Sequence, residues 1–231
     1  MPLLPLFPLD LVLLPGTPLP LHIFEPRYKE MIAECRAGDA PFGIVRAGEG
    51  GLAAVGCTAE IVSVTKEYPD GRLDLIAEGR TRFEVLELNQ ERSFLRAEVL
   101  MVPDEPAAAS SSEIERAIQV YREILALAGA VPDISSLDQS STDQSSTDQS
   151  STDQSSTDRP STDRPASRQG ALSYHIAGTL PLALDFKQKL LEMRSERQRI
   201  PAIAEYLETI LPNLRRAART REKAGGNGHA H

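Results

Sequence analysis

Short runs of branched and aromatic side chains, separated by turn residues, fill residues 41–102, and this is the pattern of β-strands. The runs are residues 42–45, 55–68, 73–78, 82–88 and 94–102. Pro69, Asp70 and Gly71 lie between two runs and predict a hairpin turn. Residues 3–8 are also apolar, but their prolines exclude a helix and a central strand, so we predict an edge strand. Five or six short strands with little helix between them predict a small, strongly curved sheet or barrel.

A helical period marks two other parts of the chain. The first is one amphipathic helix that begins near Pro26 and ends at Gly38. Its expected buried stripe is Tyr28, Met31, Ile32 and Cys35. The second part starts at residue 107 and contains several helices. Their expected stripes are Ile114, Ile118, Tyr121 and Leu125, then Leu172, Ile176 and Leu180, then Phe186, Leu190 and Met193, and finally Ile200, Ile203, Leu207, Ile210 and Leu214.

Capping motifs predict where these later helices begin. The paired residues are Ser112 with Glu115, Asp185 with Gln188, and Ser195 with Gln198. Pro201 and Pro212 lie inside the last apolar stripe. Because each proline removes one backbone hydrogen bond, we expect the last helix to kink or restart at these positions.

Residues 138–168 have a composition unlike the rest of the chain. The unit Asp-Gln-Ser-Ser-Thr repeats there, and Ala166 is the single apolar residue. The whole chain is 41% hydrophobic, and leaving this tract out raises the value to about 47%, which is ordinary for a globular protein. The tract buries too little to offset the entropy of ordering, so we predict a disordered loop. Expansion of a tandem repeat explains it best, and a phosphorylatable or partner-binding segment is the alternative.

The net charge of −8 is distributed unevenly along the sequence. Residues 1–106 carry a net charge of −7, whereas residues 169–231 carry +4. The acidic front part repels phosphate, which makes nucleic acid an unfavourable partner for it. A basic cluster follows the last apolar stripe and consists of Arg215, Arg216, Arg219, Arg221 and Lys223. We interpret it as the solvated C-terminal end of a helix, and contact with an acidic partner or nucleic acid is the alternative.

Residue patterns that carry known chemistry are missing from residues 1–231. There is no G-x-S-x-G elbow and no G-x-x-x-x-G-K-[ST] phosphate loop. Cys35 and Cys57 do not form a C-x-x-C pair, and we interpret both as core residues. The histidines are too scattered for a metal site, and they are His22, His175, His229 and His231. We therefore predict no catalytic residue, no cofactor and no metal, and the pattern assigns no partner-binding residue.

The first 24 residues are apolar enough to raise the question of a signal or membrane segment. They contain six prolines and Asp10, which would break a spanning helix repeatedly, and no basic stretch precedes them. We therefore expect a soluble, cytoplasmic protein with reduced cysteines and no membrane partner.

Several motifs together resemble a known family. They are LLPLFPL at residues 3–9, VLLPG at 12–16, LPLHIFEPRY at 19–28, EGRTRF at 78–83, LPL at 180–182 and KQKLLE at 187–192. This succession is similar to the N-terminal, substrate-binding domain of Lon-type ATP-dependent proteases. The resemblance covers residues 1–106 and 107–218, apart from the repeat tract, and the chain resembles the stand-alone Lon-domain proteins.

The resemblance implies an α+β fold in which a PUA-like β-barrel with one helix is followed by a C-terminal helical bundle. The expected domains are residues 1–106 for the β-rich subdomain and 107–218 for the bundle, interrupted by the disordered repeat at 138–168. Residues 219–231 are expected to be a flexible basic tail that ends in Gly and His. In complete Lon proteases, ATP hydrolysis and peptide cleavage belong to later domains, so the resemblance carries no catalytic residue to this chain.

Three hypotheses about function follow. The first is a non-enzymatic module that binds unfolded or tagged proteins, as an adaptor or accessory in protein quality control, with a separate protease as a candidate partner. The second is an RNA or nucleobase reader, because PUA-like barrels resemble RNA-binding domains, although fold alone is a weak reason. The third is a true peptidase, which the missing motifs oppose. The pattern assigns no oligomeric state.

Overall fold

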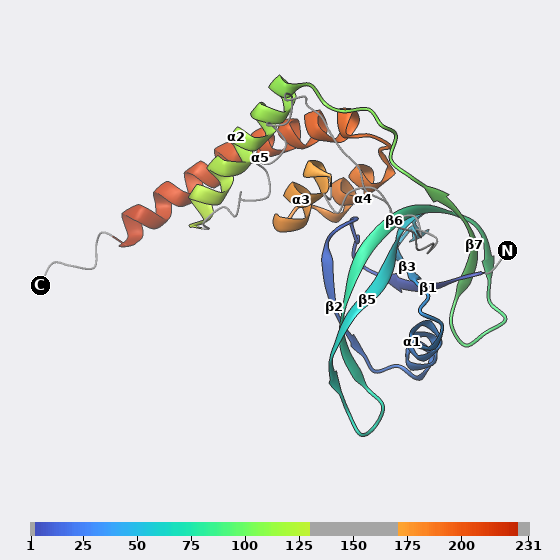
Figure 1. The fold of residues 1–231 in the computed structure, drawn as a ribbon. Coiled ribbons are helices and arrows are strands. Elements are labelled where there is room, and N and C mark those ends of the chain that lie inside the picture. The colour runs from blue at the N-terminus through green and yellow to red at the C-terminus, as the bar shows by residue number, and fades with distance from the viewer. Residues whose placement is uncertain (1–2, 130–170, 226–231) are drawn as a thin grey trace, which may run out of the picture.

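The computed structural model describes residues 3–129 and 171–225, which form a curved sheet with helices at one end (Figure 1). The strands in these residues are β1 (Leu4–Leu9), β2 (Pro18–Ile23), β3 (Phe42–Gly48), β4 (Gly51–Leu52), β5 (Val55–Glu67), β6 (Leu73–Asn89) and β7 (Arg96–Val102). The helices there are α1 (Pro26–Gly38), α2 (Ser111–Ala128), α3 (Leu172–Thr179), α4 (Leu184–Glu192) and α5 (Glu196–Gly225). The predicted disordered repeat at 138–168 lies outside the described residues.

The strand pairings form a closed ring. In the described residues the order is β1-β7-β6-β5-β3-β4, β2 pairs with β6, and β1 also pairs with β3. The β1–β3 pairing is parallel, with Leu6 opposite Gly43, and the other pairings are antiparallel. The sheet is therefore large, mostly antiparallel and returns to its first strand.

The prediction of an edge strand at residues 3–8 is wrong, because β1 has a neighbour on each side. It pairs with β7 at Leu4 and Pro5 and with β3 from Leu6 onward. The two pairings meet at Leu6, which lies opposite Gly43 and whose N–H donates to the Leu95 carbonyl at 2.8 Å, so Pro5 and Pro8 each have one paired side. A proline can turn its missing N–H toward the side that has no neighbour at that point, which is how a proline-rich segment closes the ring.

β6 is one strand of 17 residues, although Gly79 separates two predicted strands. The Gly79 N–H donates to the Thr17 carbonyl at 3.0 Å, and the Gly16 N–H donates to the Gly79 carbonyl at 2.8 Å. A Cβ on Gly79 would lie 2.3 Å from the Leu14 carbonyl oxygen. Glycine is thus needed here for close approach of the 10–17 loop rather than for a turn.

The helices bury most of the predicted stripes. All four predicted residues of α1 are buried, as are Ile200, Ile203 and Leu207 of α5. In α5 the stripe then shifts to Leu211, and Leu214 is 36% exposed. One core cluster joins side chains from both halves of the chain, for example Leu14 and Cys57 with Tyr174 and Leu190. The sheet and the helices therefore share a core.

α5 continues as one helix through Pro201 and Pro212, so the expected restart does not occur. Buried side chains lie before and after Pro201, and Leu211 is buried just before Pro212, which offsets the lost hydrogen bonds. Ion pairs Arg116–Glu208 and Arg215–Glu123 join α2 to α5 in the same order along both helices, so these helices run in the same direction. Residues 219–225, which we predicted to begin a flexible tail, continue α5.

The predicted caps are shifted or replaced. A capping box opens α2 at Ser110 and Glu113 instead of Ser112 and Glu115, because three consecutive serines allow both registers. No side chain caps α4: Asp185 pairs with Arg46 at 2.6 Å instead. At the start of α5, Gln198 Oε1 accepts from the Arg194 N–H at 2.9 Å.

We expect Ser110→Ala to lower the free energy of unfolding by about 1 kcal/mol, because the Glu113 N–H loses its capping oxygen. Chemical denaturation followed by circular dichroism measures this change. Ser112→Ala is the matched control and should change stability by less than about 0.5 kcal/mol. Equal effects of the two substitutions would contradict the assignment of Ser110 as the cap.

Candidate protein-binding surface

The thiols that we singled out in the sequence are buried. Burial raises the pKa of Cys35 to about 11, helped by the nearby Glu34 carboxylate. Burial also raises the pKa of Cys57 to about 12. Both thiols therefore stay protonated at neutral pH and act as small core side chains, as the sequence indicated.

The histidines lie apart from one another. His22 is on β2, where its Nδ1 lies 2.5 Å from Asp74 Oδ1 and its ring stacks on Phe24. This contact holds the pKa of the Asp74 carboxyl below its ordinary value, and the Tyr68 hydroxyl adds to the effect. His175 is on α3, and residues 229 and 231 lie outside the described part. In residues 3–129 and 171–225, no three His, Cys, Asp or Glu side chains gather as metal ligands.

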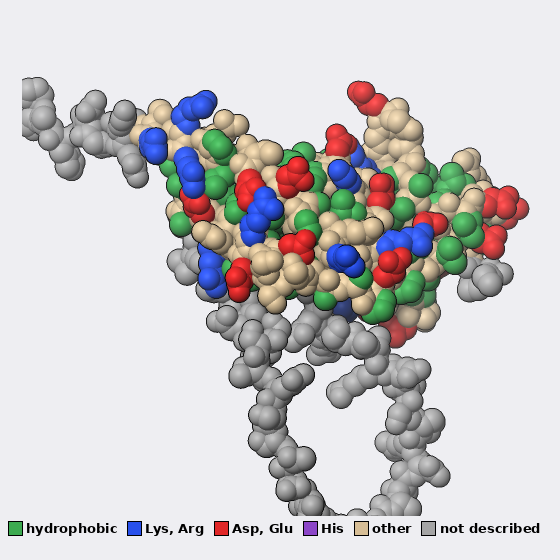
Figure 2. Space-filling view, turned by 90° about the horizontal axis from the view of Figure 1, so that it is seen from above, with side chains coloured by type: hydrophobic (Ala, Val, Ile, Leu, Met, Phe, Trp, Pro, Cys, Tyr) green, Lys and Arg blue, Asp and Glu red, His purple; other side chains and the backbone are tan. Residues whose placement is uncertain are grey.

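The basic cluster occupies the C-terminal part of α5. Because α5 ends at Gly225, Arg221 and Lys223 lie in or next to its last turn, as we predicted. Arg215 and Arg216 lie more than two turns before the end, beyond the reach of the helix dipole. Arg215 instead pairs with Glu123 of α2 at 2.6 Å. Figure 2 shows Lys and Arg side chains toward this end of α5, with acidic side chains among them.

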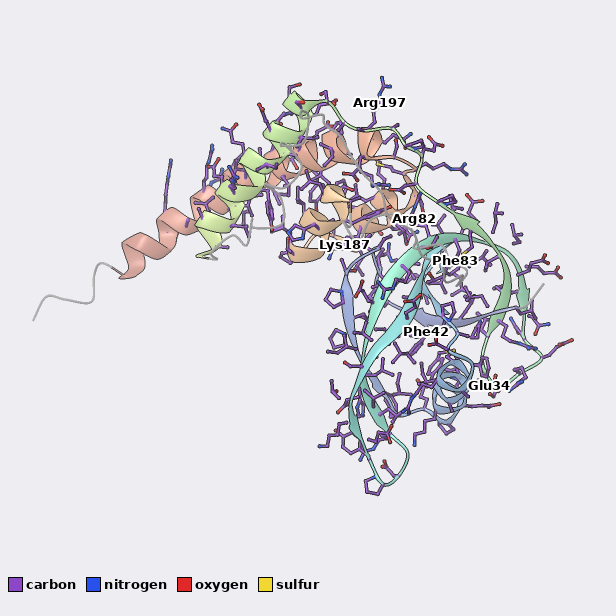
Figure 3. The ribbon with its side chains drawn as sticks, in the orientation of Figure 1. Glu34, Phe42, Arg82, Phe83, Lys187 and Arg197 are labelled. Carbon is purple, nitrogen blue, oxygen red and sulfur yellow. The ribbon has the colours of Figure 1, made fainter. Side chains whose placement is uncertain are left out.

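A buried polar network, which sequence reasoning missed, joins the sheet to the helices. Arg82 of β6 is 2% exposed and donates to the carbonyls of Leu191 at 3.0 Å and Met193 at 2.7 Å. Arg199 of α5 is fully buried, and both arginines contact the carboxylate of Asp104. Figure 3 places Arg82 at the junction between the sheet and the helices.

Arg199 has a full set of partners within this network. Its Nε donates to Ser173 Oγ at 2.8 Å, and its Nη2 lies 2.9 Å from Glu196 Oε1. Its guanidinium also lies 4.2 Å from the centre of the Tyr174 ring. Burial by itself would lower the pKa of Arg199, but its hydrogen bonds to Asp104 and the nearby charges outweigh burial and raise the pKa above its ordinary value. The network therefore fixes the linker after β7 and holds β6 against the helices.

Exposed apolar side chains concentrate on two adjacent strands. Among the residues that the structure describes, seven large apolar side chains are exposed, and four of them lie on β6 and β7. They are Leu86, Leu88, Leu100 and Met101. Leu100 and Met101 are consecutive and point to opposite faces, and the register places Leu88 with Met101 on the inner face. We call the outer face with Leu86 and Leu100, which are 58% and 53% exposed, the β6–β7 surface. Two large apolar side chains exposed on one face of one strand pair mark a contact surface better than scattered apolar residues do.

The register explains why Leu86 and Leu100 face outward together. Leu100 lies opposite Glu84, and side chains directly opposite each other share a face. Leu86 is two residues after Glu84 on β6, so alternation places it on the same outer face. A β-bulge at Leu86 then places Glu87 on this face as well, opposite Glu98.

A small core supports this strand pair from inside the ring. Phe83 is fully buried there among Leu4, Leu6 and Val45 (Figure 3). Glycines 43 and 56 make room for its ring, because a Cβ would lie 2.7 Å and 2.5 Å, respectively, from Phe83 Cζ. The outer face of β6 and β7 therefore rests on a packed interior.

The sequence carried a weak signal for this surface. Residues 99–102 are four apolar residues in succession, whereas a half-buried strand alternates apolar and polar side chains. Such a run leaves some apolar side chains on the solvent side. Which of them are exposed depends on the pairing of β7 with β6, and this pairing is not visible in the pattern.

None of the helices in the described residues is both long enough and apolar enough to cross a membrane.

A scan against protein families matches residues 3–209 to the ATP-dependent protease La (LON) substrate-binding domain. The Lon protease of Parabacteroides distasonis is 30% identical over 140 residues, which is 56% of this chain and 17% of that protease. The Lon protease of Flavobacterium johnsoniae is 28% identical over 137 residues, 52% of this chain and 17% of the protease. The chain thus matches a small part of the length of these curated relatives.

Solved structures are similar over most of the chain. A Lon N-terminal domain protein from Xanthomonas campestris superposes with a TM-score of 0.60 and 25% identity, covering 87% of this chain and 95% of that one. The N-terminal domain of the Mycobacterium avium complex Lon protease gives a TM-score of 0.61 with 17% identity, covering 90% and 98%. The second likeness concerns the fold alone.

Proposed function

The chain belongs to the ATP-dependent protease La (LON) substrate-binding domain family, and from this premise we propose that it binds exposed apolar segments of other proteins through the β6–β7 surface. A substrate-recognition module needs apolar side chains that remain exposed in the folded state. The observation that carries the proposal is the exposure of Leu86 and Leu100 on the same outer face of two adjacent strands.

Rigidity of the surface also supports this role. The β6–β7 register sets the direction of Leu86 and Leu100, and the packed interior beneath β6 and β7 keeps the strands in place. A surface that is ordered before binding loses little conformational entropy when a segment docks. An extended, unfolded segment can then contact Leu86 and Leu100 without a rearrangement of the sheet.

As part of this proposal, the closed ring of strand pairings is a PUA-like barrel and α2–α5 are a helical bundle docked on it. The chain acts without catalysis, as an adaptor or accessory in cytoplasmic protein quality control, and a separate protease is its candidate partner. The absence of nucleotide-binding and serine-nucleophile motifs from residues 1–231 supports a role in binding. RNA reading is less well supported, because glutamates surround the exposed leucines of the β6–β7 surface.

We expect the double substitution Leu86→Ser and Leu100→Ser to weaken binding of an unfolded protein by about tenfold or more, because central apolar contacts contribute on the order of 1–2 kcal/mol each. The probe is lysozyme that has been reduced and blocked with iodoacetamide, which keeps the charge of the native protein. Fluorescence anisotropy with purified wild-type and variant chains measures the dissociation constants. Native lysozyme should bind much more weakly than the unfolded form.

Val62→Ser is the matched control, since Val62 is 54% exposed on β5. It should leave binding of unfolded lysozyme unchanged. Equal binding of native and unfolded lysozyme, or unchanged binding by the leucine variant, would contradict the proposed function. Cleavage of the probe by the purified chain with ATP would contradict the non-enzymatic role.

A further inference from the structure

We propose that the β6–β7 surface selects apolar segments that carry Lys or Arg beside their apolar residues. This inference rests on the proposed function and names the chemistry of the segment that is bound. It follows from two glutamates, Glu87 and Glu98, that lie among the exposed leucines.

Glu87 and Glu98 are directly opposite each other in the β6–β7 register. Both side chains are exposed, and within the described part of the chain neither forms an ion pair or accepts a hydrogen bond. Like charges that face each other across two strands repel and destabilise the pair. The strand pair therefore holds a small unfavourable interaction that the folded chain leaves uncompensated.

Other carboxylates near this strand pair do have cationic partners. Glu84 lies 3.2 Å from Arg194, and Glu91 lies 3.7 Å from Arg96. On α1, Glu30 accepts from Arg92 at 2.9 Å. Glu87 and Glu98 differ from these neighbours in having none, so their negative charge is available to a bound molecule.

The two carboxylates lie on the same face as the apolar contacts. Glu98 is two residues before Leu100 on β7, which places both side chains on one face of the strand. Glu87 follows Leu86 in the bulge of β6. A segment that covers the leucines therefore brings its own flanking side chains to the glutamates. Cationic flanks would remove the repulsion, whereas acidic flanks would add to it.

Figure 2 agrees with this arrangement at a coarser level. In the view from above, hydrophobic and acidic side chains lie next to each other at the end of the molecule where β7 lies. The sequence also favours a cationic occupant, because residues 1–106 carry a net charge of −7. Long-range attraction should speed the encounter with a basic segment, and salt should weaken it.

Three synthetic peptides test the inference. They share one apolar sequence and differ only in their flanking residues, which are lysine, glutamine or glutamate. For the wild-type chain we expect the order of affinity Lys over Gln over Glu, with about threefold to tenfold between the first two, as two exposed ion pairs allow. The Lys-flanked peptide should also lose affinity as salt is raised, whereas the Gln-flanked peptide should not.

The decisive variant is Glu87→Gln combined with Glu98→Gln. It should bind the Lys-flanked peptide about threefold to tenfold more weakly and bind the Gln-flanked peptide as the wild type does. Glu115→Gln with Glu205→Gln, at exposed positions on α2 and α5, is the matched control and should change neither. Removing the repulsion should also raise the melting temperature by about 1–2 °C, so the variant gains stability while it loses affinity.

Two kinds of failure can be told apart. If the wild type bound all three peptides equally and Leu86→Ser with Leu100→Ser abolished that binding, the proposed function would stand and the selection of basic flanks would be overturned. Unchanged affinity of the glutamine variant for the Lys-flanked peptide would overturn it as well. If the wild type bound none of the peptides, the proposed function and this inference would both fail.

Discussion

Replacing Arg199 by alanine is expected to lower the free energy of unfolding by about 3 kcal/mol, the range seen when one partner of a buried ion pair is removed. Arg199 is fully buried, and its substitution leaves Ser173 and Glu196 without the guanidinium that faces them. Asp104 loses one of its two arginines and keeps Arg82. Asp104 and Glu196 keep partial access to water, at 37% and 24% exposure, which places the expected value at the lower end of that range. Chemical denaturation of the whole chain measures the change.

The matched control for Arg199→Ala is Arg215→Ala. Arg215 also pairs with a glutamate across two elements, but its side chain is 50% exposed. Exposed pairs contribute little, so this substitution should change the free energy of unfolding by less than about 1 kcal/mol. A loss below about 1 kcal/mol for Arg199→Ala would mean that water replaces the guanidinium and that the network does not hold the sheet to the helices.

The sequence predicted the helices well because their buried apolar residues recur with the helical period. In α1 the spacing of Tyr28, Met31, Ile32 and Cys35 matches the buried face, and in α5 the same holds as far as Leu207. These residues are apolar and face one surface, so periodicity alone identifies them. Their burial depends little on what the other half of the chain does.

Periodicity could not predict that Arg82 and Arg199 are buried. A charged residue inside a strand or helix pattern is normally assigned to the solvent side, since arginine is rarely buried without a partner. Their partners include backbone carbonyls of Leu191 and Met193 and the distant Asp104. Long-range pairing of this kind leaves no local signal in the sequence.

The candidate surface was missed for a related reason. Leu86 and Leu100 are apolar, and an apolar residue in a strand is expected to be buried. The cross-strand register places both on the outer face, and that register depends on how β6 pairs with β7. The opposition of Glu87 and Glu98 likewise appears only once that register is known.

β6 connects the parts of the molecule that matter for binding. Arg82 holds the strand to the helices, the next residue, Phe83, fills the interior of the ring, and Leu86 stands on the outer face four positions after Arg82. Successive side chains of a strand point to opposite faces, so one strand can serve the junction, the interior and the surface. The position of the β6–β7 surface therefore depends on how well Phe83 is packed.

Phe83→Ala is expected to lower the free energy of unfolding by about 3–5 kcal/mol, because it leaves a cavity inside the ring. Gly43→Ala should lower it by about 1–3 kcal/mol, since the new methyl group would overlap Phe83 and the side chains of Leu4 and Leu6. In the double variant that methyl group enters the cavity, so the two effects should fall short of their sum by at least about 1 kcal/mol.

Gly48→Ala is the control for this cycle, because a Cβ at Gly48 has nothing within 4 Å. Its effect on the free energy of unfolding should add to that of Phe83→Ala without coupling. Binding of unfolded lysozyme is also measured for Gly43→Ala and for the double variant, under conditions in which each is fully folded. This measurement tests whether the packing around Phe83 affects the β6–β7 surface. Since the Phe83 ring supports β6 beneath Leu86, affinity should fall in both. Strict additivity of Gly43→Ala and Phe83→Ala would show instead that Gly43 is not needed to make room for the Phe83 ring.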